Sequence, residues 1–269
     1  MKTPNPLKLI TAILGLSLLF YLANLLLGIP FPKGSFAWGL LPNLLIVSFF
    51  YLLIKKTTLS GYKLMGYLFC IYFIIGHFNI LIEAYIFNVT DQAQSLREML
   101  RGLIVAWAFA PILLKLFGQG KDEKENQLEK RSLFSWIWRI ILADFLYMFF
   151  YATAGFVLVT IYPQLLDFYE GKIPPFPLVL KTQLFLRGLV FAGIAVLIDH
   201  FTLAPRLQKA LLIGACFSIL GGLAPLIAPN ELMPAYVRFG HAFEVGISNF
   251  LYGFVLAYLL GRRPVKEIA

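Results

Sequence analysis

Eight apolar segments dominate the sequence, and each is long enough to cross the hydrocarbon core of a bilayer as a helix. We expect these spans at residues 7–28, 36–54, 62–87, 95–116, 133–161, 177–198, 207–227 and 233–260. The segments are continuous and rich in leucine, isoleucine and phenylalanine, whereas the strands of a membrane β-barrel alternate apolar and polar residues. With 59% hydrophobic residues, the chain is predicted to be an all-α, polytopic helical membrane protein.

The basic residues indicate how the spans are oriented. Most of the 23 lysines and arginines fall on one side of the predicted bundle, among them Lys55, Lys56, Lys115, Arg206 and Arg262. Because lysine and arginine gather in cytoplasmic loops, both termini are predicted to be cytoplasmic, in a protein integral to the plasma (inner) membrane. The net charge of +9 is then explained by topology, and no nucleic-acid partner is predicted.

One strongly hydrophilic stretch, residues 118–132, interrupts the apolar pattern. It carries charges of both signs and lacks apolar periodicity, which is typical of a solvated loop. We predict that this loop is cytoplasmic and separates two four-helix halves of one membrane domain, residues 1–117 and 133–269.

The last span carries an unusual number of polar side chains for a membrane helix. A turn of 100° per residue brings several of them to one side of the helix: Arg238, His241, Ser248, Asn249 and Tyr252, with Glu244 at the edge. Contact between charged groups and lipid is costly, so this side is expected to face protein or water.

Other spans supply ionisable groups at similar depth. Counting about 1.5 Å per residue from each predicted end places a candidate site near the midplane or in the outer half of the bilayer. Its members are Glu83, Arg101, Asp144, Arg187, Arg238, His241 and Glu244. The acids and arginines of these spans balance, so ion pairs are expected. Asp144 with Arg187 is the clearest predicted pair.

Helical spacing predicts which of these groups share a face. Asn79 and Glu83 fall on the same face as Tyr72, and Gln183 shares a face with Arg187. The facing is therefore partly favourable for one polar site, although His77 lies roughly 120° or more around the helix from Glu83.

Two spans repeat an arginine followed by a glycine, Arg101-Gly102 and Arg187-Gly188. A glycine lets another helix approach closely, while the guanidinium reaches a carboxylate with two donors. The repeat predicts close helix contacts beside each arginine.

The first functional hypothesis is a polar cavity that binds or transports a small anionic or zwitterionic ligand. Arginines near the midplane would hold the ligand, and the glycines and proline of Gly221-Gly222-Leu-Ala-Pro225 suit a helix that moves or unwinds around a site. Membrane lipids are the other partners predicted.

An intramembrane hydrolase or a metal-dependent enzyme is the alternative. His241 and Glu244 would act as an acid-base pair, or bind a metal together with Glu83 or His77. The segment Glu98-Met-Leu-Arg101 partly resembles the glutamate-arginine motif of the membrane-embedded CAAX-protease-type family, in which later histidine motifs complete the site. This chain has one glutamate there, and Val245 stands where the HxxxN motif after His241 requires asparagine, so we do not assign it to that family.

A third hypothesis is a structural or assembly subunit, in which the charges only hold helices together. The sequence contains no HExxH, GxSG or Walker motif, which disfavours zinc protease, rhomboid-type and nucleotide-hydrolysing chemistry. No cofactor and no resident metal site are predicted.

Overall fold

The computed structural model describes residues 5–31, 34–118, 128–230 and 233–262. These residues contain eight helices long and apolar enough to cross a membrane: Pro6–Leu27, Phe36–Lys56, Gly61–Ile86, Gln92–Phe117, Leu133–Ile161, Phe176–Phe201, Arg206–Ile227 and Ala235–Leu260. Every predicted span matches its helix to within a few residues, so the prediction of an all-helical multi-pass membrane protein is confirmed. Residues 119–127 of the predicted loop lie outside the described residues.

Five of the spans are uninterrupted helices: α1 (Pro6–Leu27), α2 (Ser35–Lys56), α5 (Gln92–Phe117), α6 (Leu133–Ile161) and α12 (Ala235–Leu260). The other three each contain a π-helical turn. They are α3 (Gly61–Phe73) with η1 (Ile74–Phe78) and α4 (Asn79–Ile86); α8 (Phe176–Thr182) with η2 (Gln183–Gly188) and α9 (Leu189–Phe201); and α10 (Arg206–Ser218) with η3 (Ile219–Leu223) and α11 (Ala224–Ile227). A short helix, α7 (Leu165–Tyr169), lies in the connection after α6. Such π turns are frequent at functional sites.

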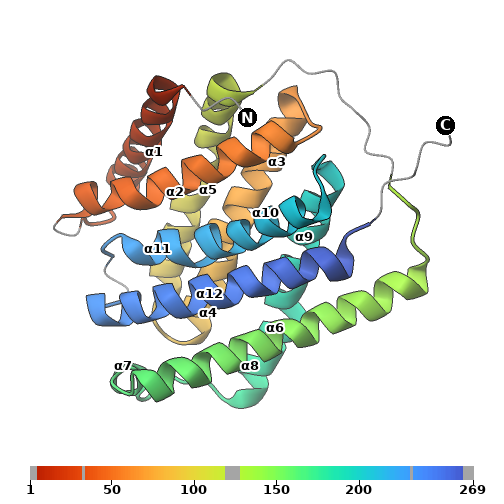
Figure 1. Cartoon of the computed structure of the whole chain (residues 1–269). Coiled ribbons are helices and arrows are strands. Elements are labelled where there is room, and N and C mark those ends of the chain that lie inside the picture. The colour runs from red at the N-terminus through yellow and green to blue at the C-terminus, as the bar shows by residue number, and fades with distance from the viewer. Residues whose placement is uncertain (1–4, 32–33, 119–127, 231–232, 263–269) are drawn as a thin grey trace, which may run out of the picture.

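The spans form two layers (Figure 1). In front, α2, the α10–α11 span, α12 and α6 run side by side, while α5, the α3–α4 span and the α8–α9 span cross behind them. At one edge, α1 packs on α2 and α5. Because α2 packs against α10 and α11, helices from the two predicted halves contribute to one hydrophobic core. The division into halves stays a prediction.

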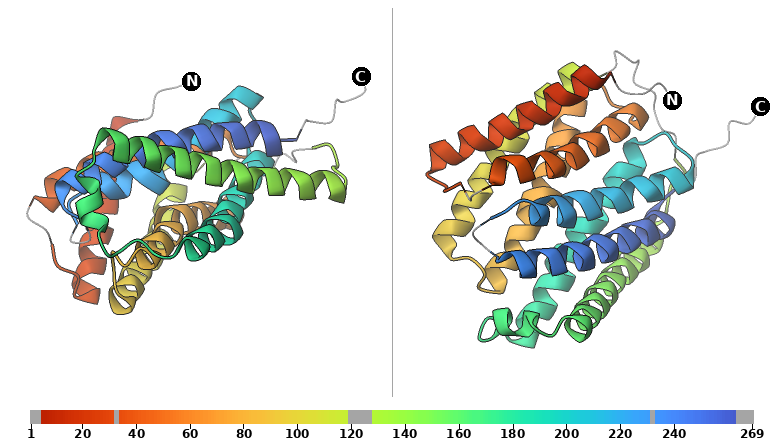
Figure 2. Two further views of the ribbon diagram at one scale, coloured as in Figure 1. Left: turned by 90° about the horizontal axis from the view of Figure 1, so that it is seen from below. Right: turned by 60° about the vertical axis from the view of Figure 1, so that its left-hand side comes forward.

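The two ends of the bundle differ in charge. At one end, Lys56 Nζ donates to Gln208 Oε1 at 2.6 Å, and the main-chain N–H of Arg262 donates to Asp199 Oδ2 at 3.1 Å. These contacts join the end of α2, the end of α9, the start of α10 and the end of α12. We call this end, which also carries Arg131, the basic end. In the right-hand view of Figure 2, the turns that follow α1, α4 and α11 lie at the opposite end.

Glycines allow α10 and α12 to pack closely. A Cβ added to Gly214 would lie 2.8 Å from the carbonyl oxygen of Phe250, and one added to Gly253 would lie 2.9 Å from that of Ile213. Any larger residue would force the two helices apart, because interior packing leaves little spare volume. The backbone contact between these helices therefore depends on glycine.

The outer faces of α6 and α12 are apolar and exposed, as expected for contact with lipid. Phe156 on α6 and Phe243 on α12 are exposed to 74% and 71%. On the other side of α12, Arg238, Asn249 and Tyr252 are buried. The expectation that the polar side of the last span faces protein is met for these residues.

Candidate functional site

A pocket of about 510 Å³ opens near the end of the bundle opposite the basic end. It lies between α1, α2, the α3–α4 span, α5 and the α10–α11 span, and we call it the α1–α5 pocket. Most of its wall is apolar, and its polar lining residues are Ser17, Tyr21, Asn24, Asn43, Tyr72, His77, Gln94, Arg97, Glu98, Arg101 and Asn230. Pockets of roughly 300–1,000 Å³ with apolar walls and a few polar groups are typical of small-molecule sites.

Of the seven candidate residues, Arg101 lines this pocket. Its guanidinium forms an ion pair with Glu98 on the same helix, and Nη1 donates to Asn24 Oδ1 on α1 at 3.4 Å. The guanidinium carbon also lies 5.7 Å from the centre of the Phe20 ring. Arg97 is exposed one turn nearer the end of the bundle. These two arginines outnumber Glu98, so this part of the pocket carries net positive charge.

Three polar atoms of the pocket are buried and have no hydrogen-bond partner among the described residues: Tyr72 Oη, His77 Nε2 and Arg101 Nε. A buried polar group without a partner costs about 1–3 kcal/mol. All three atoms are covered by neighbouring groups, so another polar group could reach them only after side chains of the pocket wall move.

Gly102 determines where His77 lies. A Cβ added at position 102 would come within 2.6 Å of His77 Cβ and closer still to the imidazole. The histidine ring therefore lies directly against α5, beside Arg101. The predicted close approach at Arg101-Gly102 is present, and it is made by the His77 side chain.

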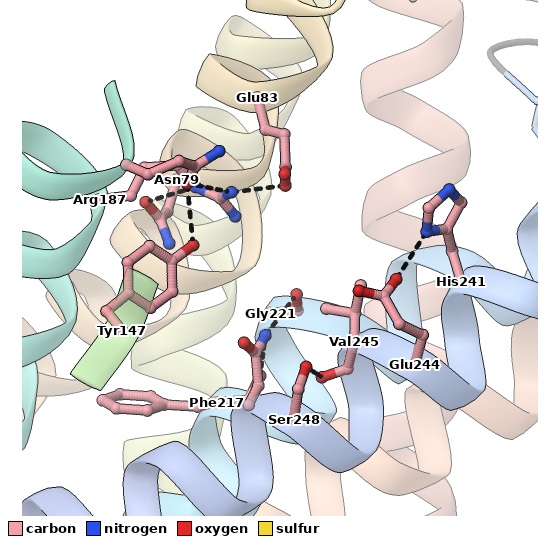
Figure 3. A network of polar contacts seen from close by, with 12 residues as sticks. Asn79, Glu83, Tyr147, Arg187, Phe217, Gly221, His241, Glu244, Val245 and Ser248 are labelled. Atoms are coloured by element: carbon pink, nitrogen blue, oxygen red, sulfur yellow. Dashed lines mark hydrogen bonds and ion pairs between the residues drawn. The ribbon is translucent and has the colours of Figure 1, made fainter. Parts of the chain in front are cut away.

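A second polar group surrounds Arg187, which is 2% exposed (Figure 3). Its Nη1 lies 2.6 Å from Glu83 Oε2 and donates to Gln183 Oε1 at 3.1 Å, while Nε donates to Asn79 Oδ1 at 3.4 Å. The Tyr147 hydroxyl also donates to Gln183 Oε1, at 3.2 Å. Gln183 and Arg187 share a face of η2, as predicted, and Glu83 supplies the counter-charge.

The predicted ion pair between Asp144 and Arg187 is wrong. Asp144 instead places its carboxylate against Gly188, and its buried Oδ1 has no partner among the described residues. Arg187 extends from η2 toward α4, where Glu83 takes the position of the counter-ion. The predicted close approach at Arg187-Gly188 is present, but it is made by the Asp144 side chain.

Arg238 has a different role. Its Nη1 donates to the carbonyl oxygens of Leu226, Ile227 and Ala228 at 3.2, 3.1 and 2.7 Å. The last carbonyls of a helix lack partners within that helix and attract cations. Arg238 therefore caps the end of α11.

His241 and Glu244 do form a pair. Nδ1 of His241 lies 2.8 Å from Glu244 Oε2, as Figure 3 shows, and Nε2 lies 2.8 Å from the hydroxyl of Tyr169 on α7. Burial raises the pKa of Tyr169, so this phenol stays protonated at neutral pH and donates to Nε2. The imidazole can then donate through Nδ1 to the carboxylate.

The described residues contain no group of three histidine, cysteine or acidic side chains that could hold a metal ion. Glu83 faces Arg187 and His77 lines the α1–α5 pocket. The ligand set proposed for His241 and Glu244 therefore lacks its expected third member.

The seven candidate residues are divided between two regions and one helix cap. Glu83, Asp144, Arg187 and Glu244 lie close enough to Tyr147 for their charges to act on it, whereas Arg101 and Arg238 lie elsewhere. Arg101 lines the pocket, Glu83 and Arg187 form an ion pair beside Asp144, Arg238 caps α11, and His241 pairs with Glu244. Their involvement in ligand binding stays a prediction.

Sequence reasoning missed Asn24 and Asn43 in the pocket and Tyr169 beside His241. Each asparagine is the one amide side chain of its apolar span, which is a weak signal of a polar contact inside the membrane. Nothing in the spacing of Tyr169 relates it to His241, which is 72 positions away.

The fold and these polar groups define an all-helical, multi-pass membrane protein with buried charged residues. Comparison with known proteins found no matching family model, no similar curated protein and no similar solved structure.

Proposed function

We propose that this protein binds, in the α1–α5 pocket, an amphiphilic ligand with an anionic or zwitterionic head. The observation that carries the proposal is the cluster of three buried, unpartnered polar atoms on Tyr72, His77 and Arg101 in one pocket. Movement of the side chains that cover these atoms would let a head group bind them, and the apolar wall would hold a hydrocarbon tail.

The charges of the pocket favour a negative head. Arg97 and Arg101 face a single acid, Glu98, and a guanidinium suits a carboxylate or phosphate because its planar donors match such groups. Asn24 adds an amide beside Arg101. A cationic group in the same ligand could pair with the Glu98 carboxylate, so a zwitterionic head also fits.

We further propose that both termini are cytoplasmic and that the pocket opens toward the outer side. The basic end of the bundle supports this orientation through the positive-inside rule. The ligand would then enter from the outer leaflet or the outer solution. Binding is the first step of transport, so the transport hypothesis rests on the same pocket.

The test uses photoreactive palmitic acid and the matching fatty alcohol as probes on the purified full chain. We expect the acid to label the residues that line the pocket and the alcohol to label them weakly. Arg101→Gln should reduce labelling by the acid at least about tenfold, because hydrogen bonds to charged groups contribute 1.5–3 kcal/mol.

Two further variants separate head from tail recognition. Gly39 lines the pocket and a Cβ there meets nothing within 4 Å, so Gly39→Phe should fill space and reduce labelling without changing charge. Glu244→Gln is the matched control, because Glu244 lies outside the pocket. Equal labelling of wild type and Arg101→Gln would contradict the proposal, as would equal labelling by the acid and the alcohol.

An enzymatic role for His241 is the second candidate, supported by the 2.8 Å contact of Nδ1 with Glu244. A carboxylate at this position orients an imidazole for proton transfer. Tyr169 occupies Nε2, the nitrogen that would accept a proton. Hydrolysis would therefore require Tyr169 to move away or to take part.

A further inference from the structure

A second pocket, of about 350 Å³, lies at the basic end. It is lined by Glu129, Lys130, Arg131, Arg139, Arg206, Tyr258, Leu259, Gly261 and Arg262, and we call it the arginine pocket. The lining includes five basic side chains and one acid. Such an excess of positive charge in one concave site attracts anions.

Three of the arginines are held by the last turn of α12. Arg131 donates to the carbonyl oxygens of Leu260 and Gly261 at 2.8 and 2.9 Å, Arg139 donates to that of Leu259 at 3.1 Å, and Arg206 donates to that of Tyr258. The helix carbonyls thus fix the positions of the guanidinium groups. Each guanidinium has five N–H donors, so each retains donors for a further acceptor.

Among the described residues, the acids at the pocket are fewer than its basic groups, and Asp199 already has other partners. Asp199 accepts from Lys209 Nζ at 3.0 Å and from the main-chain N–H of Arg262. The Arg262 side chain contacts His200 Nδ1 at 2.7 Å, and its Nε is buried with no partner among the described residues. Burial, together with the nearby charges of Arg139 and Arg262, lowers the pKa of Arg131.

Aromatic rings place the pocket at the membrane surface. Arg131 lies 4.7 Å from the ring centre of Trp136, Arg139 lies 4.1 Å from that of Trp138, and Arg206 lies 5.1 Å from that of Tyr258. Tryptophan and tyrosine are enriched at the level of lipid head groups. Exposed apolar side chains of α6, including Leu133 and Phe134, begin directly beside the pocket.

From the concave shape, the excess of basic side chains and the interfacial aromatic rings, we propose that the arginine pocket binds the phosphate head group of an anionic phospholipid. The acyl chains would lie along the apolar face of α6. Basic pockets between membrane helices suit such head groups. This inference does not depend on the ligand of the α1–α5 pocket, which lies toward the other end of the bundle.

The experiment titrates the delipidated full chain with phosphatidylglycerol and with phosphatidylcholine of identical chains, measured by native mass spectrometry. We expect phosphatidylglycerol to bind at least about fivefold more tightly, the effect of one unit charge near a lipid surface. Arg262→Gln should weaken that binding by about fivefold. Arg262 is chosen because, among the four arginines, its side chain makes no bond to the carbonyls of α12.

Lys130→Gln is the second variant, because Lys130 is exposed and its replacement leaves the arginine contacts with the carbonyls of α12 intact. The affinity for phosphatidylglycerol should again fall by about fivefold. Lys181→Gln is the matched control, since Lys181 is exposed on α8 and lines neither pocket. Folding of each variant is followed by its thermal unfolding.

Three outcomes would overturn the proposal. The first is equal affinity for the two lipids. The second is displacement of bound phosphatidylglycerol by inorganic phosphate at the same concentration as by the lipid itself, which would identify a site for a soluble anion. The third is binding that appears only after Asp122, Glu123 and Glu125 are neutralised, which would assign the site to carboxylates of the chain itself.

Discussion

Glu83→Gln tests how much the buried ion pair with Arg187 contributes to folding. The substitution keeps the shape of the side chain but removes the negative charge 2.6 Å from Arg187 Nη1. The remaining partners of Arg187, Asn79 and Gln183, are neutral amides. The cation would therefore stay in the core without a counter-charge.

The exposed fractions of the two side chains predict an asymmetric cost. Removing one partner of a fully buried pair costs about 3–5 kcal/mol, but Glu83 is 28% exposed and Arg187 only 3%. Leaving Arg187 alone should cost about 3 kcal/mol, near the lower limit of that range. Arg187→Gln should cost less, about 1–2 kcal/mol, because the partly exposed Glu83 can be hydrated. The double variant should be more stable than the sum of the two effects predicts.

The assay uses a buried thiol of the protein. Cys216 is 0% exposed, so in a Cys70→Ala background a thiol-reactive dye reports unfolding as the detergent-solubilised protein is heated. A loss of about 3 kcal/mol corresponds to a fall in Tm of roughly 6–12 °C. Glu170→Gln, in an exposed connection, is the control. A Tm for Glu83→Gln within about 2 °C of the control, or a larger loss for Arg187→Gln, would refute the reasoning.

Two further predictions concern packing and protonation. Gly102→Ala should lower the free energy of unfolding by about 1–3 kcal/mol because the new Cβ would meet His77. The control is Gly66→Ala, which should be neutral or stabilising because a Cβ there meets nothing within 4 Å. Equal Tm values for the two variants would contradict the close contact between Gly102 and His77. Tyr169→Phe should cost about 1 kcal/mol at neutral pH by removing the bond to His241. Burial raises the pKa of Tyr169 above its ordinary 10.0, so above pH 10 the folded state retains a proton that the unfolded state loses. The difference in free energy of unfolding between wild type and Tyr169→Phe should therefore shrink above pH 10. Tryptophan fluorescence during unfolding, at neutral pH and just above pH 10, measures this; an unchanged difference would contradict it.

The spans and their buried faces could be predicted because few structures satisfy a long apolar segment in a bilayer. In α12, the helical period correctly placed Asn249 and Tyr252 toward protein, since both side chains are buried. Both results depend on composition and on the regular geometry of an α-helix.

The partners of the buried charges could not be predicted, because the π turns change that geometry. Tyr72 and Asn79, seven positions apart, should share a face in a regular helix. Between them, η1 adds a residue to one turn, so Tyr72 lines the α1–α5 pocket while Asn79 turns to Arg187. The same turn brings Tyr72 and His77 together, with ring centres 5.2 Å apart.

The arrangement of charges also determines which substitutions can reveal function. Arg187 has an acid and two amides as partners, and Arg238 holds the end of α11, so replacing either one disturbs folding whatever the protein binds. Arg101 differs because it lines a pocket in which three polar atoms have no partner among the described residues. Its ion pair is made within α5 to Glu98, and its hydrogen bond to another helix is the long one to Asn24 on α1, at 3.4 Å. Its loss should therefore disturb the contacts between helices less than the loss of Arg187 does. A change in ligand binding at constant Tm is therefore expected for Arg101 and not for Arg187, and this difference distinguishes a binding role for the intramembrane charges from a purely structural one.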